Sequence, residues 1–309
     1  MDLFIIGNGF DIAHGLKTKY QDFANYLKIN NINLYDEICI IYGNLSDEDI
    51  LWKNFEKAME SIDEDFIRVD TNFDLEYNDL YDGNLKGMIE EKIKNKLLNI
   101  SEELFEYFEQ WAESIDTKGI KKITSKIKSS EENEDLFLTF NYNFLLENSY
   151  DVDSSQICYI HISIGKELIL GHGNKLKIKE LEKELSFLNE NDEETTDTID
   201  SLEEKISIEE NLEYYNRTYK NTEKIISLHK EFFKSLTEVE NIYIIGHSLG
   251  DVDFPYFKEV LKNVSPDTKW FVYYYDYEDE KKASKLKDNL KIKPEKIEIL
   301  NSCEFYDLV

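Results

Sequence analysis

Runs of consecutive apolar residues recur along the chain, and stretches with a helical spacing of apolar residues separate many of them. Several runs are continuous rather than alternating, which is typical of strands buried on both faces of a parallel sheet. Strands that alternate with helices predict an α/β fold, here with a mostly parallel sheet. The runs with strand character are Leu3–Ile6, Leu136–Thr139, Ile157–Ile162, Leu168–Leu170, Ile242–Ile245, Trp270–Tyr275 and Ile297–Leu300.

Two helical insertions interrupt the strand-bearing segments. The first spans residues 46–129 and carries a stripe of apolar residues at helical spacing from Leu85 to Ile115, which is typical of the core of a helical subdomain. The second spans residues 176–236 and has the pattern of a helical hairpin with an acidic turn. The remaining segments, 1–45, 130–175 and 237–309, are expected to form one core domain.

Acidic side chains outnumber basic ones by 65 to 36, so the formal net charge is −29. Binding a nucleic-acid backbone needs a basic surface, so the charge disfavours nucleic-acid partners and a nuclease toxin. Anionic membranes are disfavoured for the same reason, and no apolar run reaches the length of a membrane span. Residues 180–213 contain 14 acidic and 2 basic side chains, so this hairpin is either a solvated projection or a partner-binding arm.

The cysteines and the N-terminal residues bear on the cellular compartment. Cys39, Cys158 and Cys303 are far apart and form no CxxC pair, which argues against a zinc ribbon and against a disulfide framework. The first residues lack the basic region of a signal peptide. Both observations favour a cytoplasmic protein.

The first candidate for chemistry is the turn Gly7–Gly9, which follows the first predicted strand. Glycines let backbone amides approach a phosphate, and a helix N-terminus adds positive potential. Ile12 occupies the place of the third glycine of the usual dinucleotide fingerprint, so a tight turn and a phosphate loop are both compatible with the pattern. Asp11 and His14 are three residues apart, which places them on one face of the following helix.

Three further polar segments also follow predicted strands. Asn141 comes after the second strand, His161 after the third, and the turn Gly246–Gly250 after the strand Ile242–Ile245. Ligands of open α/β sheets bind at this edge. No carboxylate is spaced to complete a metal site with the histidines, so we predict no metal. Four of the five histidines fall in or close to these segments, namely His14, His161, His172 and His247.

The turn Gly246–Gly250 also matches the G-x-S-x-G nucleophile elbow, with Ser248 in the place of the nucleophile. An α/β-hydrolase needs its histidine after the serine, but His247 is the last histidine in the chain. We therefore interpret Ser248 as a ligand-contacting or turn residue, and ester hydrolysis through it as a lesser alternative.

Taken together, the motifs resemble those of the AbiH family of bacterial abortive-infection proteins. That family is in turn similar to sirtuin-like, DHS-type NAD-binding domains, which implies a Rossmann-like core. The matching segments are Ile6-Gly7-Asn8-Gly9-Phe10-Asp11-Ile12-Ala13-His14-Gly15-Leu16, Thr139-Phe140-Asn141-Tyr142, Leu170-Gly171-His172-Gly173-Asn174 and Gly246-His247-Ser248-Leu249-Gly250-Asp251-Val252-Asp253.

The resemblance implies roles for individual residues. Asn141 would hold the nicotinamide ribose or a water, and His161 would be the catalytic base. His161 is followed by Ile162 where sirtuins have glycine, so His172, which precedes a glycine, is the alternative base. Asp11 and His14 would be auxiliary. The residues implied in cofactor binding are Gly7, Asn8, Gly9, Phe10, Gly246, His247, Ser248 and Asp253.

The function implied by the resemblance is that of an antiphage effector that binds NAD and hydrolyses its nicotinamide N-glycosidic bond. Three scattered cysteines cannot build the four-cysteine zinc module of sirtuin deacetylases, so deacetylation is not expected. A sensor that binds NAD or ADP-ribose without turnover and signals through the acidic hairpin is the alternative. A phage-encoded trigger, a partner protein and a second copy of the chain remain open as further partners.

Overall fold

The computed structural model describes residues 1–43, 48–63, 96–131, 133–162, 168–190 and 199–307. The chain divides into two compact units, which we call the sheet unit and the helical unit. The sheet unit consists of Met1–Lys19, Gln110–Ile169 and Asn221–Val309, and the helical unit consists of Tyr20–Glu109 and Leu170–Lys220.

Six strands form one sheet in the described part of the sheet unit, and all neighbouring strands run parallel. The order across the sheet is β3-β2-β1-β4-β5-β6, so β1 lies between β2 and β4. The predicted α/β fold with a parallel sheet is therefore confirmed. The strands are β1 Asp2–Ile6, β2 Leu136–Thr139, β3 Ile157–Tyr159, β4 Asn241–Ile245, β5 Lys269–Tyr274 and β6 Ile297–Asn301.

The central strand β1 shows why the strand sequences are continuously apolar. Leu3 and Ile5 belong to one hydrophobic cluster, whereas Phe4 and Ile6 belong to another. Successive side chains of a strand point to opposite faces of the sheet. All four side chains are almost completely buried because both faces of the sheet are covered.

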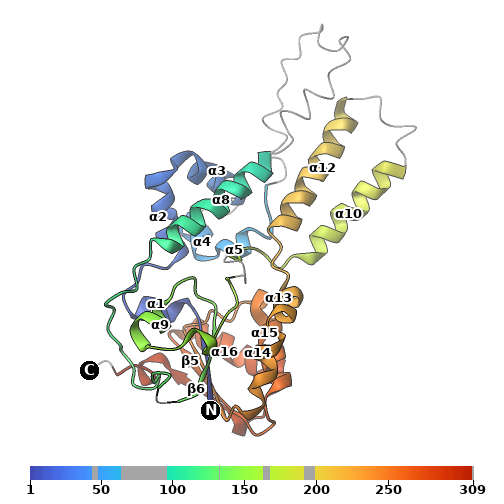
Figure 1. Ribbon diagram of the computed structural model, residues 1–309. Helices are drawn as coiled ribbons and strands as arrows, with labels where there is room; N and C mark the ends of the chain where they lie inside the picture. Colours follow the sequence, from blue (N-terminus) through green and yellow to red (C-terminus); the bar gives the residue numbers. More distant parts are fainter. Residues whose placement is uncertain (44–47, 64–95, 132, 163–167, 191–198, 308–309) are drawn as a thin grey trace. The chain divides into compact units, whose positions relative to one another are not determined.

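Helices cover both faces of this sheet (Figure 1). The connections that follow β1 and β2 carry α1 and α9, whose apolar residues join the cluster that contains Phe4. Apolar residues of α13 and α14, which precede β4, of α15, which follows β4, and of α16, which follows β5, join the opposite cluster. The bounds are α1 Asn8–Ala13, α9 Leu145–Tyr150, α13 Thr222–Leu228, α14 Lys230–Lys234, α15 Phe254–Asn263 and α16 Tyr277–Leu290, with short 3-10 turns at Ser154–Gln156, Ser235–Glu238, Asp251–Asp253 (η4), Pro294–Lys296 and Ser302–Glu304.

The helical unit begins at Tyr20, ahead of the first predicted insertion, because α2 and α3 pack against α4. Aromatic side chains dominate its core; Trp52 stacks on Phe55 with 4.9 Å between the ring centroids. A buried ion pair joins Lys220 Nζ to Glu56 Oε1 at 2.8 Å. The helices are α2 Tyr20–Asn30, α3 Ile32–Tyr42, α4 Glu48–Lys53, α5 Phe55–Ala58, α8 Lys96–Glu113, α10 Lys175–Glu190 and α12 Ile199–Arg217.

α10 and α12 are the two helices of the predicted hairpin, and they pack side by side (Figure 1). The acidic turn predicted between them falls in residues 191–198, outside the described residues. The part of the apolar stripe that precedes Lys96 also lies outside them. None of the helices in the described segments combines the length and the hydropathy of a membrane span.

One of the seven predicted strands is wrong. Leu168–Leu170 forms no strand of the sheet, because Leu168 makes only an isolated antiparallel bridge to Ile162. The Ile169 amide donates a hydrogen bond to the His161 carbonyl at 2.8 Å, so this segment runs back along the chain that leaves β3. β3 itself ends at Tyr159 rather than at Ile162.

Candidate functional site

The carboxyl ends of β1, β2, β3 and β4 lie next to one another because the strands are parallel and adjacent. Gly7 follows β1, and Asn141 comes two residues after β2. His161 and His247 follow β3 and β4 at the same distance of two residues. The sheet therefore brings four predicted site segments to one edge, which we call the carboxyl edge.

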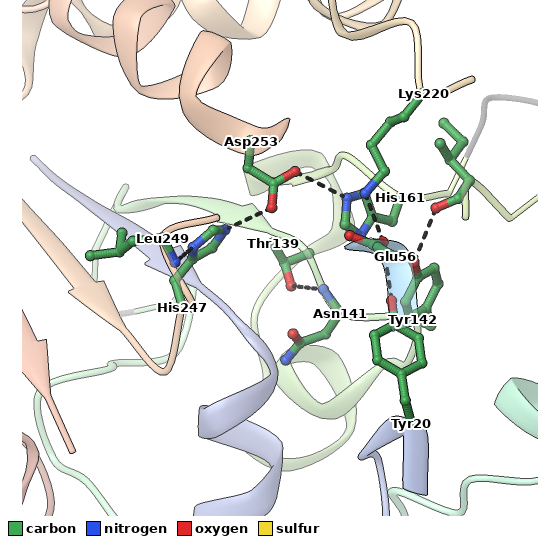
Figure 2. A network of polar contacts seen from close by, with 11 residues as sticks. Tyr20, Glu56, Thr139, Asn141, Tyr142, His161, Lys220, His247, Leu249 and Asp253 are labelled. Carbon is green, nitrogen blue, oxygen red and sulfur yellow. Dashed lines mark hydrogen bonds and ion pairs between the residues drawn. The ribbon is translucent and has the colours of Figure 1, made fainter. Parts of the chain in front are cut away.

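Asp253 joins the two histidines of this edge, as Figure 2 shows. Its Oδ1 lies 3.8 Å from His161 Nε2, and its Oδ2 lies 3.6 Å from His247 Nε2. All three residues are buried, with exposed fractions of 5% to 9%. One carboxylate thus faces two imidazoles in a medium where an unbalanced charge is costly.

The position of Asp253 in the chain explains why its carboxylate is available for the histidines. It is the N-cap residue of α15, where an aspartate normally accepts a hydrogen bond from an amide of the first turn. Its side chain makes no such bond, and Pro255 at the second helical position has no N–H to donate. The carboxylate instead points to the imidazoles (Figure 2).

The loop after β4 fixes the tautomer of His247. The Leu249 amide donates a hydrogen bond to His247 Nδ1 at 2.9 Å, so the neutral ring carries its proton on Nε2, which faces Asp253. Phe140 and Phe257 meet the ring edge-on, with centroids 4.3 and 5.2 Å away. His247 therefore turns a protonated nitrogen toward the Asp253 carboxylate, 3.6 Å away.

His161 is oriented by aromatic contacts and by its backbone. Its ring stacks on Tyr142 with centroids 5.3 Å apart and meets Phe140 edge-on at 5.4 Å. The Tyr142 hydroxyl donates to the Ile169 carbonyl at 3.0 Å, and the Ile169 amide donates to the His161 carbonyl. The ring is thus positioned by Phe140 and Tyr142, which follow β2, and its backbone by Ile169 in the segment after β3.

Asn141 is buried beside the turn that follows β1. Its side-chain Nδ2 donates to the Gly7 carbonyl at 3.3 Å, and its amide donates to Thr139 Oγ1 at 3.2 Å. Its Oδ1 is buried and has no hydrogen-bond partner among the described residues. The side chain therefore presents an acceptor oxygen whose bonding capacity is unused.

Asp11 is the other buried carboxyl group of this edge, with an exposed fraction of 1%. Burial raises the pKa of Asp11 to about 7, although hydrogen bonds from the Asn143 and Asn141 side chains act in the opposite direction. Asn143 Nδ2 donates to Asp11 Oδ2, while Asp11 Oδ1 has no hydrogen-bond partner in the described segments. Asn143 was not singled out from the sequence; its signal was the repeated polar residue just after β2.

The glycines after β1 serve a contact between two loops. The Gly7 amide donates to the Ile245 carbonyl at 3.0 Å, and the Gly9 amide donates to the Gly246 carbonyl at 2.7 Å. A Cβ added at Gly7 would lie 2.5 Å from His247 Cα. The Phe10 amide donates to the Gly7 carbonyl at 3.0 Å, so three of the four amides predicted to cradle phosphates are bonded within the protein.

The remaining predicted residues lie around this loop contact. Asn8 is exposed, and its Nδ2 donates to the Thr18 carbonyl at 2.7 Å. Ser248 is exposed, and no hydrogen bond in the described segments joins its hydroxyl to a histidine. His14 lies 2.7 Å from both the Phe10 carbonyl and the Tyr150 hydroxyl, and burial lowers its pKa.

His172 belongs to the helical unit, so the structure does not group it with His161. Its Nδ1 accepts a hydrogen bond from the Asn174 amide at 3.0 Å, and its Nε2 donates to the Tyr215 carbonyl at 3.2 Å. Burial lowers the pKa of His172 to about 4. A neutral ring with both nitrogens bonded to backbone groups serves the packing of its unit.

We expect acidification from pH 6.5 toward pH 4 to destabilise the protein through His172. The unfolded chain binds a proton on this residue below its ordinary pKa of 6.5, while the folded ring stays neutral until about pH 4. Stability is therefore lost as the pH falls, by at most about 1.4 kcal/mol per pH unit. Urea unfolding of the wild type and of His172→Gln at pH 7, 6 and 5 measures this; equal pH slopes in the two proteins would contradict it.

The geometry defines an α/β protein whose parallel sheet carries a buried His–Asp–His cluster and two buried acceptor side chains at its carboxyl edge. The family model described as Bacteriophage abortive infection AbiH matches residues 3–274, and the chain belongs to this family. No curated protein and no solved structure matches the chain. Among the described residues, no group of three or more His, Cys, Asp or Glu side chains is arranged to hold a metal ion.

Proposed function

We propose that this protein is an abortive-infection effector that binds NAD at the carboxyl edge and hydrolyses its nicotinamide N-glycosidic bond. The observation that carries the proposal is the strand order β3-β2-β1-β4-β5-β6, combined with polar residues at the ends of β1 to β4. Rossmann-like sheets of this order bind dinucleotides at the point where the strand order reverses, here between β1 and β4.

The side chains of the edge suit the chemistry of this hydrolysis. The bond between C1′ of the ribose and the nicotinamide nitrogen breaks with its electron pair on nicotinamide, and a water oxygen adds to the resulting ribosyl cation. One water proton must leave, and His161 accepts it as the general base. Asp253, 3.8 Å away, balances the charge of the imidazolium that forms.

Asn141 positions the ribose or the attacking water in this scheme. Its buried Oδ1 is available to accept a hydrogen bond, and its Nδ2 is tied to the loop after β1. The glycine loops after β1 and β4 border the dinucleotide. A phage-encoded trigger, met in the cytoplasm, starts the reaction.

Turnover of NAD by the purified full chain tests the proposal. The wild type should release nicotinamide and ADP-ribose in equal amounts, with the trigger co-expressed if the resting protein is silent. Asn141→Ala should reduce the rate about a hundredfold, since it removes a positioning contact at the reacting ribose. His229→Gln, which changes a half-buried histidine outside the carboxyl edge, is the matched control and should retain the wild-type rate.

A nucleotide sensor is the second candidate, favoured by the acidic helices α10 and α12, which offer a surface for a basic partner. It predicts saturable binding of NAD or ADP-ribose with no release of nicotinamide. Calorimetric titration beside the turnover assay separates the two candidates. If the protein co-expressed with the trigger binds neither NAD nor ADP-ribose and releases no nicotinamide, both are wrong.

A further inference from the structure

Two buried side-chain oxygens at the carboxyl edge, Oδ1 of Asp11 and Oδ1 of Asn141, indicate which chemical group the site binds. Asp11 and Asn141 have exposed fractions of 1% and 5%, and the Oδ1 atom of each has no hydrogen-bond partner among the described residues. Buried polar atoms are almost always paired in folded proteins. Two such atoms on neighbouring side chains indicate a group that donates hydrogen bonds to them.

The hydrogen bonds around this pair leave acceptors rather than donors for a ligand. Asn143 Nδ2 donates to the other oxygen of Asp11, and Asn141 Nδ2 is used by the Gly7 carbonyl. The Asn141 side chain is also close enough to Asp11 to lower its pKa. The pair therefore offers two acceptor oxygens, one of them on a carboxyl group, and would repel a phosphate.

We infer that Asp11 and Asn141 together bind the vicinal diol of the nicotinamide-side ribose, each accepting one hydroxyl hydrogen. The inference rests on the proposed function and assigns Asp11 as a further binding residue of that site. A diol presents two O–H donors on adjacent carbons, which matches two neighbouring acceptors. A carboxylate that accepts from a ribose hydroxyl is a chemically suitable partner in a dinucleotide site.

Asp11 gives this binding a pH dependence that can be measured. Hydrogen bonds to an ionised carboxylate are stronger than those to a neutral acid, so ribose binds better when Asp11 is deprotonated. Because burial places the pKa of Asp11 at about 7, affinity should fall as the pH drops from 8 to 6.

The titratable neighbours of Asp11 come from each element packed against it. His14 is the C-cap residue of the helix that carries Asp11, and burial lowers its pKa. Tyr159 from β3 and Tyr306 near the C-terminus have pKa values raised by burial, so both phenols are neutral between pH 6 and 8. Glu147 on α9 is bonded to the Tyr159 hydroxyl, and its pKa is also raised by burial. A Glu147→Gln variant therefore belongs in the test.

Calorimetric titration of the full chain with ADP-ribose at pH 6, 7 and 8 tests the inference, because this probe keeps the ribose but has no bond to cleave. The wild-type Kd should rise about tenfold from pH 8 to pH 6, as expected for a single ionisation near pH 7. Asp11→Asn should weaken binding at pH 8 about tenfold and abolish the pH dependence. ADP, which lacks this ribose, should bind both proteins equally.

Two control variants should bind ADP-ribose with the same pH dependence as the wild type if Asp11 is the group that titrates. Glu147→Gln changes the carboxyl group that accepts from the Tyr159 hydroxyl, and Asp135→Asn changes a buried aspartate that accepts from the Asp2 amide at the start of β1. Asn143→Ala removes a hydrogen bond that lowers the pKa of Asp11, so the midpoint of the pH dependence should move upward. This variant gives a second test if Asp11→Asn does not fold.

The outcomes separate this inference from the proposed function. Equal ADP-ribose binding by wild type and Asp11→Asn at every pH would overturn the role of Asp11, while NAD turnover by the wild type would still support the function. If Asp11→Asn lost as much affinity for ADP as for ADP-ribose, the role of Asp11 would also be overturned, because Asp11 and Asn141 would then not bind the ribose that ADP lacks. A wild type that binds neither NAD nor ADP-ribose overturns both.

Discussion

Replacing His161 by alanine is expected to reduce NAD turnover about a thousandfold while leaving ADP-ribose binding within about threefold of the wild type. The reason is that a proton must leave the attacking water, and His161 is the imidazole that Asp253 and Tyr142 hold at the end of β3. Steady-state kinetics and calorimetry on the same preparations measure the two quantities. A variant that turns over NAD as fast as the wild type would exclude His161 as the base.

Asp253→Asn tests the cluster without removing either imidazole. An amide keeps one oxygen and replaces the other by NH₂, so it can no longer turn an oxygen to each of the two imidazoles as the carboxylate does. Since the Leu249 amide holds the proton of His247 on Nε2, the amide oxygen goes to His247 and leaves the NH₂ facing His161. His161 then adopts the wrong tautomer, and we expect turnover to fall about a hundredfold.

Asp251→Asn is the matched control for this change. Asp251 lies two residues earlier on the same short turn, is exposed, and pairs with Lys285 at 2.9 Å. Turnover should be unchanged, because its charge is solvated and is not part of the cluster. Similar losses in the two variants would mean that net charge near the edge, and not the His–Asp–His geometry, sets the rate.

Gly246→Ala is expected to be the most destabilising single substitution proposed for this chain, with a loss of about 4 kcal/mol in the free energy of unfolding. Gly246 has a φ of 66°, and a Cβ there would lie 2.2 Å from the Phe10 amide nitrogen. The carbonyl of the same residue accepts from the Gly9 amide at 2.7 Å, so the loops cannot separate without losing this bond. Urea unfolding followed by far-UV circular dichroism measures the change.

Gly15→Ala separates the effect of conformation from that of crowding. Gly15 has a φ of 80°, but no atom would lie within 4 Å of an added Cβ. We expect a loss of about 1–2 kcal/mol, from the left-handed conformation alone. Equal losses at the two positions would show that the loop contact can relax, and that the glycines after β1 have another role.

The sheet could be predicted because burial on both faces leaves a continuous apolar sequence, as in Leu3–Ile6. The same rule was misleading at Leu168–Leu170, where Leu168 makes only an isolated bridge. β3 is also three residues long, but each of its residues pairs with one of β2, and an apolar run does not show whether a neighbouring strand is in register.

That the candidate residues after β1 to β4 lie at one edge of the sheet could be predicted, but the pairing among their side chains could not. Strand ends gave Asn141, His161 and His247, because parallel strands bring their carboxyl ends together. The Asp253 side chain does not cap α15, because Pro255 has no N–H to donate and because the imidazoles of His161 and His247 lie opposite its carboxylate. No local pattern reports such a contact.

Glycine and histidine patterns were ambiguous for physical reasons. A glycine is required wherever a backbone approaches closely, whether the neighbour is a phosphate or another loop, so the turn Gly7–Gly9 could not distinguish them. His161 and His172 look alike in sequence. Only the bonds of His172 to the Asn174 amide and the Tyr215 carbonyl show that its ring has a packing role.

The central position of β1 has a consequence for synthesis of the chain. Of the six strands of the sheet, β1 is translated first, yet its register pairs Leu3 with Leu136 on one side and with Ile242 on the other. Its two neighbours are therefore translated long after it, and such non-local pairing folds late. The carboxyl edge cannot be assembled until the loop after β4 and Asp253 have emerged. A nascent chain that lacks the segment after β4 therefore carries no complete His–Asp–His cluster.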